Sequence, residues 1–212
     1  AAGDAGTWHV PDVVLRAISD TALGLDGDKV AQHYAVKAIE NIATQCPSIA
    51  QNWFFSLVML QGLAAHVCNS SWDAFRSSCL AAVVHLVRGS DEQELDMLQS
   101  LSDPSLLSAG LGGGLGPQAV AHGLQLVAAI LLRAPNIGAA ASAMPSNVVD
   151  LLMGVMSQPR FNVTLRARAA LLLSMLCALD DFRESRCLRR AIEQLLVSHV
   201  DRLGRDKDQF AL

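Results

Sequence analysis

The stretch Tyr34-Ala-Val-Lys-Ala-Ile-Glu-Asn-Ile-Ala43 recurs as a pattern further along the chain, and this recurrence is the strongest indication of the fold. Nine-residue windows that begin at Ala35, Cys79 and Gly123 read AVKAIENIA, CLAAVVHLV and GLQLVAAIL, each forty-four residues after the last. A fourth window, ARAALLLSM from Ala167, follows at about the same interval. A period of this length is typical of stacked helical repeats.

Small and aliphatic residues coincide in the aligned windows at every third position, the spacing that keeps side chains on one face of a helix. We therefore expect these positions to form the core of an all-α fold. They are Val36, Leu80, Leu124 and Ala169; Ile39, Val83, Val127 and Leu172; and Ile42, Leu86, Ile130 and Met175.

The composition favours helices over strands and gives no sign of a membrane protein. Of the 212 residues, 51% are hydrophobic but only 5% are aromatic, and no segment alternates apolar with polar residues. The most apolar stretches, 123–132 and 169–179, are about ten residues long, which is too short to span a bilayer. Five cysteines, an odd number, without a secretory signal indicate reduced thiols and a cytoplasmic protein.

A single domain over residues 1–212 accommodates about four such units. The longest helix of each unit is expected near 28–45, 72–88, 117–133 and 162–180. Shorter helices are predicted between them, over 11–23, 47–51, 53–67, 90–100, from Pro104, and over 135–141 and 146–156. The glycine-rich run 110–116 is predicted to be a flexible loop. An amphipathic helix over 183–203 is predicted to cap the end, followed by a disordered tail over 204–212.

A short, a medium and a long helix in each unit is the armadillo arrangement. The window Ala35-Val-Lys-Ala-Ile-Glu-Asn-Ile-Ala43 resembles the third-helix consensus of armadillo proteins, and Asn41 stands at the asparagine of that consensus. The resemblance implies a right-handed superhelical solenoid of the armadillo/HEAT type. It also implies binding of extended peptides along a groove that the third helices line.

The side chains that clamp peptides in armadillo proteins are mostly replaced in this chain. The asparagine position reads Asn41, His85, Ala129 and Ser174, and the tryptophan position reads Lys37, Ala81, Gln125 and Ala170. This departure argues against cargo recognition of the nuclear-import type. Protein binding by other chemistry on the same face is expected instead, at His33, Lys37, Asn41, His85 and Gln125.

The longer phrase His33-Tyr-Ala-Val-Lys-Ala-Ile-Glu-Asn-Ile-Ala-Thr-Gln45 is similar to the C-terminal helical-repeat region of Fused and RUNKEL-like serine/threonine kinases and pseudokinases. The similarity implies a regulatory scaffold region of a kinase-like protein, linked to microtubules or cilia. The chain itself contains no Gly-rich loop after a strand, no His-Arg-Asp and no Asp-Phe-Gly.

No motif points to an enzyme, a metal site or a cofactor. The glycine run fits neither G-x-G-x-x-G nor G-x-x-x-x-G-K, and no G-x-S-x-G is present. The six histidines include no pair spaced four residues apart, the spacing that suits zinc on a helix. The chain is therefore predicted to be non-catalytic and to need neither a metal nor a cofactor.

Charge is distributed unevenly between the two halves of the sequence. Residues 1–133 carry a net charge of −6 and residues 134–212 a net charge of +2. Two interpretations of the basic part remain open: a solvated helix surface, or a docking patch for an acidic peptide or a cytoskeletal protein. Nucleic acid is not expected, because the total charge is −4 and no aromatic residues lie among the arginines. The candidate patch consists of Arg166, Arg168, Arg186, Arg189 and Arg190.

The sequence thus predicts a protein-interaction scaffold with a protein partner and no membrane span. The alternative is a structural segment that packs against further repeats of a longer chain, or against a second copy, without a peptide groove. Exposure of Trp8, Val10 and Val13 would indicate a missing neighbour and so favour this alternative.

Overall fold

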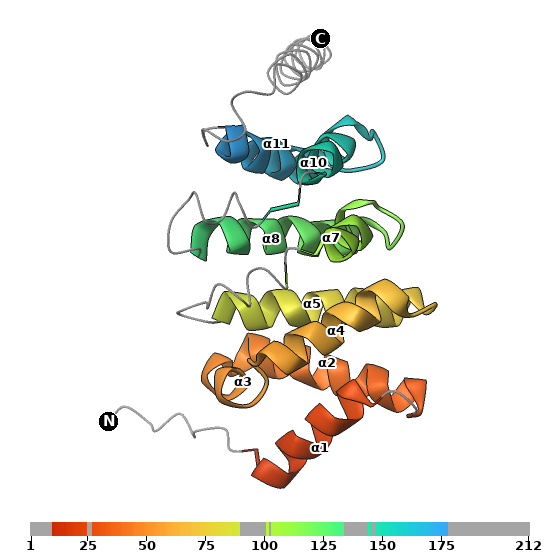
Figure 1. The fold of residues 1–212 in the computed structure, drawn as a ribbon, viewed down its shortest axis with the longest axis vertical. Helices are drawn as coiled ribbons and strands as arrows, with labels where there is room; N and C mark the ends of the chain where they lie inside the picture. The colour runs from red at the N-terminus through yellow and green to blue at the C-terminus, as the bar shows by residue number, and fades with distance from the viewer. Residues whose placement is uncertain are drawn as a thin grey trace, which may run out of the picture.

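The computed structural model describes residues 10–24, 27–89, 101, 103–133, 144–145 and 147–177. Within these ranges the regular structure is entirely helical, and the helices are stacked from α1 near one end to α10 and α11 near the other (Figure 1). The predicted all-α class is therefore confirmed. None of these helices combines the length and the apolar character that a membrane crossing requires.

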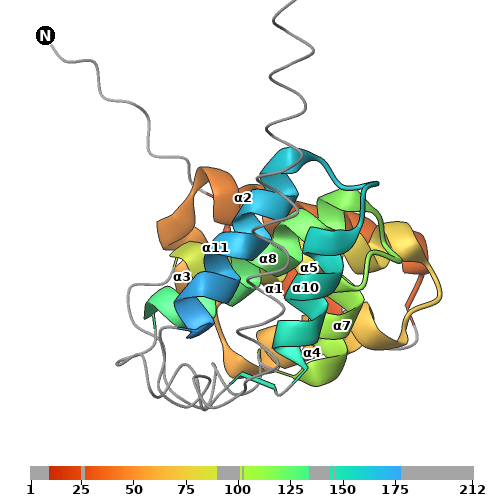
Figure 2. The same ribbon diagram turned by 90° about the horizontal axis from the view of Figure 1, so that it is seen from above.

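Two rows of helices make up the stack. In the first, which we call the long-helix row, each helix contacts the next; its members are α2 (Lys29–Gln45), α5 (Asp73–Gly89), α8 (Pro117–Arg133) and α11 (Val163–Cys177). In the second row, too, each helix contacts the next. Its members are α1 (Asp12–Leu23), α4 (Leu57–Asn69), α7 (Pro104–Leu111) and α10 (Val148–Ser157). Seen along the stack, α4, α7 and α10 lie to one side of α8 and α11 (Figure 2).

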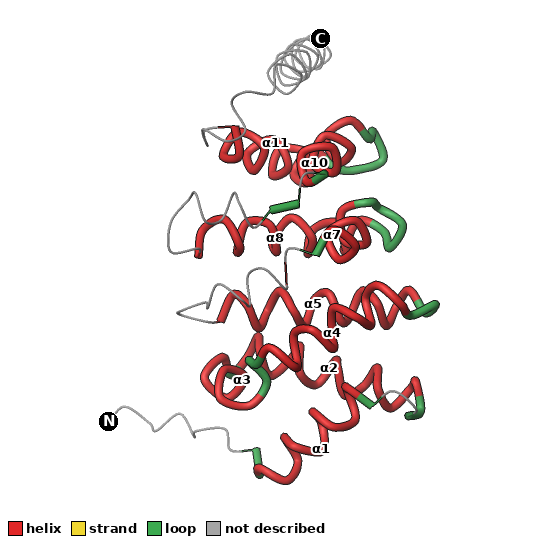
Figure 3. Tube along the Cα trace, viewed as in Figure 1, coloured by secondary structure: helices red, strands yellow, loops and turns green. Residues whose placement is uncertain are grey.

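The two rows are joined because each helix of the second row also contacts the long helix that follows it in sequence. The short α3 (Pro47–Trp53) packs against both α2 and α5. The turns that connect α4 with α5, α7 with α8, and α10 with α11 lie together on the same side of the stack (Figure 3). Each layer of the stack therefore contains one long helix, and these long helices are aligned above one another.

Polar side chains fix where several helices begin, because they accept hydrogen bonds from backbone N–H groups that have no partner in the first turn. At α2 the Asp28 carboxylate accepts from Val30 N at 2.8 Å. At α4 the Ser56 hydroxyl accepts from Met59 N at 3.2 Å. At α7 the Asp103 carboxylate accepts from Ser105 N at 2.6 Å. At α11 the Asn162 side-chain oxygen accepts from Leu165 N at 2.9 Å.

The positions predicted from the repeat to form the core are buried. In the first three windows, all nine of these side chains are at most 5% exposed. In the fourth window Ala169 and Leu172 are buried, whereas Met175 is partly buried and Leu176 takes the fully buried position instead. The contacts between neighbouring long helices therefore run along the face that the three-residue spacing selects.

The glycine run was predicted to be a loop throughout, and that prediction is wrong at its start. Gly110 and Leu111 belong to α7, and both are buried. The missing side chain of Gly110 lets α7 approach α8 closely at Gly123. The chain turns only after Leu111, where Gly113 and Gly116 adopt φ values of +77° and +89°.

The predicted helix over 53–67 is also wrong at its start. Trp53 ends α3, Phe54 is fully buried, and α4 begins only at Leu57. The serine cap at Ser56 and the burial of the Phe54 ring explain the break, which the apolar pattern does not reveal. At α10, too, the helix begins after Asn147 rather than after Ser146.

Several predictions fall on parts of the chain outside the described residues. These are the helices expected over 90–100 and 135–141, residues 178–180 of the fourth long helix, the capping helix over 183–203 and the tail over 204–212.

Candidate protein interface

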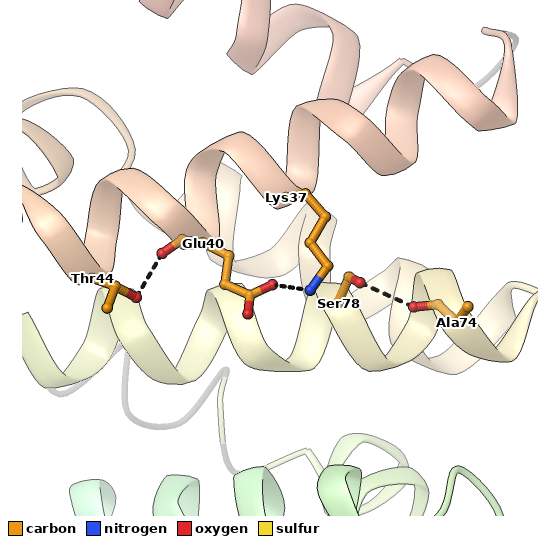
Figure 4. A network of polar contacts seen from close by, with 5 residues as sticks. All are labelled: Lys37, Glu40, Thr44, Ala74 and Ser78. Carbon is orange, nitrogen blue, oxygen red and sulfur yellow. Dashed lines mark hydrogen bonds and ion pairs between the residues drawn. The ribbon is translucent and has the colours of Figure 1, made fainter.

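An ion pair on α2 begins a line of polar side chains along the long-helix row. Lys37 Nζ lies 2.8 Å from Glu40 Oε2, and the two side chains are 45% and 18% exposed. Figure 4 shows both side chains extending from α2 toward α5, where the Ser78 hydroxyl donates to the carbonyl of Ala74 at 3.0 Å. Thr44 donates to the Glu40 carbonyl at 2.8 Å and keeps its hydroxyl on the helix.

Two histidines continue this line on the next two helices. The rings of His85 on α5 and His122 on α8 meet edge to face, with centroids 6.2 Å apart and an interplanar angle of 68°. Burial lowers the pKa of both imidazoles below the ordinary 6.5. Lys37 lowers both pKa values further, whereas Glu40 opposes the shift. The neutral form of both rings therefore predominates at pH 7, and it can donate one hydrogen bond and accept another.

His122 is the more enclosed of the two histidines. Its side chain is only 8% exposed, and its Nδ1 finds no hydrogen-bond partner within the described part of the chain. A buried ring nitrogen without a partner costs stability, and such groups in native proteins call for an explanation.

A pocket of about 290 Å³ lies beyond the histidines, between α5, α8 and α11. Two arginines and Gln125 give it a polar side, and aliphatic side chains give it an apolar side. Gln125 Oε1 is shielded from solvent and has no hydrogen-bond partner among the described residues. We call this site the arginine pocket; it is lined by Arg88, Leu124, Gln125, Ala128, Arg168, Leu171 and Leu172.

The structure connects these features into one surface. Lys37 and Glu40 act electrostatically on His85, and Arg88 lies one turn after His85 on α5. Because Arg88 also lines the arginine pocket, the surface continues from α2 through α5 and α8 to α11. Of the predicted residues, Lys37, His85, Gln125 and Arg168 belong to this surface, and Asn41 is exposed on α2.

His33 was predicted on the same surface, but its ring packs in an aromatic cluster. The centroid of its imidazole lies 4.7 Å from that of Trp72 and 6.2 Å from that of Phe75. Phe75 in turn lies 5.1 Å from the His66 ring. Burial lowers the pKa of His33, and Lys37 adds to this effect. These contacts place His33 at the junction of α2 and α5, where its ring is half-buried.

Arg166 and Arg168 were predicted to act together, but the structure gives them different surroundings. Arg166 Nε donates to the Met156 carbonyl at 2.8 Å, near the end of α10. Arg76 does the same for α4, because its Nε donates to the Val67 carbonyl at 2.7 Å. Arg166 thus binds the end of the preceding helix, whereas Arg168 is exposed in the arginine pocket. Arg186, Arg189 and Arg190 lie outside the described residues.

Sequence reasoning missed Glu40, His122, Arg88 and Leu171 as members of this surface. For Glu40 a signal was available, because it follows Lys37 by three residues, a spacing at which opposite charges pair on a helix. For His122 no sequence signal was available. The repeat aligns His85 with Ala129, which lies seven residues after His122 in α8. Within the described residues, no group of three or more His, Cys, Asp or Glu could hold a metal ion.

The fold and this surface define an all-α protein whose long-helix row carries polar side chains on each of its four helices. Comparisons with protein-family models, curated proteins and solved structures find no match for the chain.

Proposed function

We propose that the chain is a right-handed, armadillo-like solenoid of about four repeats that acts as a non-catalytic scaffold for protein binding. One observation carries this proposal: Lys37, His85, Gln125 and Arg168 come from four consecutive long helices and lie on one connected surface. A partner segment laid across the row would meet a new polar side chain at each layer. The regular order of both helix rows and the forty-four-residue period support the armadillo-like interpretation.

The proposal is tested by affinity capture from cells that express the chain, with quantitative mass spectrometry of the captured proteins. One variant combines Lys37→Glu with Asn41→Ala, and a second changes Arg186, Arg189 and Arg190 to Glu. The control, Arg16→Glu, makes the same kind of charge change at an exposed position on α1. We expect the Lys37/Asn41 variant to lose partners that the control retains. If neither surface variant loses any partner, both proposed surfaces are wrong.

The similarity of residues 33–45 to Fused and RUNKEL-like proteins supports a cytoskeletal or ciliary partner and a place in a longer kinase-like chain. Tubulin tails are acidic, so they fit a surface that ends in arginines. Co-sedimentation with microtubules, before and after proteolytic removal of the tails, tests this part. We expect binding that falls when the tails are removed; equal pelleting with both preparations argues against it.

A structural role is the second candidate, and exposed residues on α1 favour it. Of the three residues whose exposure would indicate a missing neighbour, Val13 is 73% exposed, Val10 is partly buried against the core, and Trp8 lies outside the described residues. Val14, on the same helix as Val13, is 43% exposed. Apolar side chains at the end of a stack are expected where another repeat or a second copy packs. Sedimentation velocity over a range of concentrations tests self-association, with Val13→Lys as the variant that should abolish it. A monomer at all concentrations rules out the second copy.

A further inference from the structure

We propose that the exposed face of α1 binds α1 of a second copy of this chain, with the two helices antiparallel and related by a two-fold axis. This inference rests on the second candidate, a structural role with self-association, and specifies its surface and contacts. It goes beyond the scaffold proposal, which concerns the long-helix row. It starts from the opposite charges and the small apolar side chains that share the exposed face of α1.

One face of α1 belongs to the core and the other faces solvent. The helix lies at one end of the described stack, against α2 and α4 (Figure 1). Leu15 and Ala22 are buried, whereas Val13 is 73% exposed, the highest value among the large apolar side chains of the described residues. A single exposed valine is ordinary on a protein surface, so its neighbours on the helix decide what this face can bind.

The neighbours of Val13 bring charged and small apolar groups onto one face. Val13, Ala17 and Asp20 follow the spacing of a single helix face, and Arg16 lies beside them. All four side chains are exposed. Arg16 and Asp20 have opposite charges, and the small side chain of Ala17 lets a second helix approach closely.

The order of the two charges favours a partner helix over a pair within α1. Arg16 precedes Asp20 by four residues. At this spacing on one helix, opposite charges stabilise more when the acidic residue comes first, so the order found in α1 is the weaker one. A second copy offers each of the two groups a partner across the contact.

A two-fold axis makes this face complementary to itself. In such a contact, when one residue touches a second residue of the other copy, the second touches the first in return. Two antiparallel α1 helices overlap most when their midpoints meet, and this register brings Arg16 of each copy to Asp20 of the other. Ala17 then lies near the axis, and Val13 lies over the end of the partner helix. A parallel pair would set like charges against each other, which is why we choose the antiparallel one.

The size of the contact predicts weak association. A helix of 12 residues is about 18 Å long. Two such helices bury less than the roughly 1,200 Å² of a stable complex, so we expect a dissociation constant of about 10–100 μM. Higher salt should weaken the dimer further, because exposed charges attract less strongly when they are screened.

The test measures self-association of the full chain by sedimentation velocity over a wide range of concentrations. Arg16→Asp alone sets acidic groups against each other, and Asp20→Arg alone sets basic groups against each other. Each variant should therefore weaken the dimer at least about tenfold. In an equal mixture of the two variants, one copy carries the acidic groups and the other the basic groups. We expect the mixture to associate within about threefold of the native affinity, because opposite charges again face each other.

The matched control is Asp150→Arg in the first turn of α10, near the other end of the described stack (Figure 1). It makes the same change of charge at an exposed position and should leave self-association unchanged. A second measurement uses the double variant Arg16→Asp/Asp20→Arg, which exchanges the two charges and should dimerise like the native chain. Circular dichroism checks that all variants keep the native melting temperature, as substitutions of exposed side chains should.

Three outcomes would overturn the inference. A monomer at every concentration would refute it together with the second candidate; if Val13→Lys then lowers the melting temperature, residues of the chain itself cover α1. Dimerisation that neither single variant weakens would refute the contact through α1 and leave self-association through another surface. Weakening that the mixture of variants does not reverse would refute the antiparallel register.

The scaffold proposal is independent of these outcomes. The capture experiment compares proteins other than the chain itself, and it depends on Lys37 and Asn41 on α2. Arg16→Glu should therefore keep the captured partners while its self-association weakens.

Discussion

Gly110 of α7 and Gly123 of α8 approach each other so closely that a Cβ atom on Gly123 would lie 3.0 Å from the carbonyl carbon of Gly110. A Cβ atom on Gly110 would lie 3.3 Å from the Cα atom of Gly123. The two helices therefore touch through their backbones, and this contact connects the second row to the long-helix row at the level of His122.

Gly123→Ala should destabilise the protein by about 1–2 kcal/mol. The added methyl group meets the backbone of Gly110, which cannot move aside as a side chain can, and this overpacking outweighs the better helix propensity of alanine. Urea denaturation followed by circular dichroism measures the free energy of unfolding. The matched control is Gly154→Ala in α10, where a Cβ atom meets nothing within 4 Å and stability should rise by about 0.5–1 kcal/mol. Equal effects at both positions would contradict the close contact.

Stability should fall as the pH decreases from 7.5 to 5.5. Burial sets the folded-state pKa values of His85 and His122 below 6.5, their ordinary value. At pH values between the folded-state and the unfolded-state pKa, the unfolded chain binds more protons than the folded chain. The free energy of unfolding is therefore highest above about pH 6.5 and decreases as the pH falls. Urea denaturation at several pH values measures this loss. In the double variant His85→Leu/His122→Leu the dependence should flatten, and an unchanged slope would assign the effect to other groups.

Arg166→Ala should cost about 1.5 kcal/mol of stability, whereas Arg168→Ala should change stability by less than about 0.5 kcal/mol. The first variant loses a charged hydrogen-bond donor from the end of α10, and the second removes an exposed side chain. Arg76→Ala should resemble Arg166→Ala, because Arg76 binds the end of α4 in the same way. Thermal melts of the three variants make the comparison. A larger loss in Arg168→Ala than in Arg166→Ala would reverse these roles.

Cys79 should react with iodoacetamide about a thousandfold more slowly than an exposed thiol. Its side chain is fully buried, and burial raises its pKa to about 12, so the reactive thiolate is rare. Cys46 and Cys68 are both half-buried, and burial raises the pKa of Cys68, so among these three cysteines Cys46 should react first. Mass spectrometry of the native protein after timed labelling gives the order, and labelling in urea gives the unfolded reference. Early modification of Cys79 would show that the contact between α5 and its neighbours opens readily.

The sequence alone determined the helices of the long-helix row. Each of them carries local signals: apolar residues at every third position, a cap such as Asp28 or Asn162, or a proline such as Pro117 at the first turn. These signals act within one helix, so a single sequence displays them. The repeat period also predicted which residues of different helices form the same core, and all of them except the partly buried Met175 are buried.

Only the tertiary structure decided which polar residues meet. His122 contacts His85 although the repeat aligns His85 with Ala129, because neighbouring helices need not pack in the register of their sequences. Arg166 and Arg168 separate because residues two apart on a helix point to different sides, and only the position of α10 gives Arg166 its acceptor. Gly110 lies inside α7 rather than in a loop, and α8 packs against it at Gly123. Contacts between helices depend on how the helices are placed, and no local pattern records that placement.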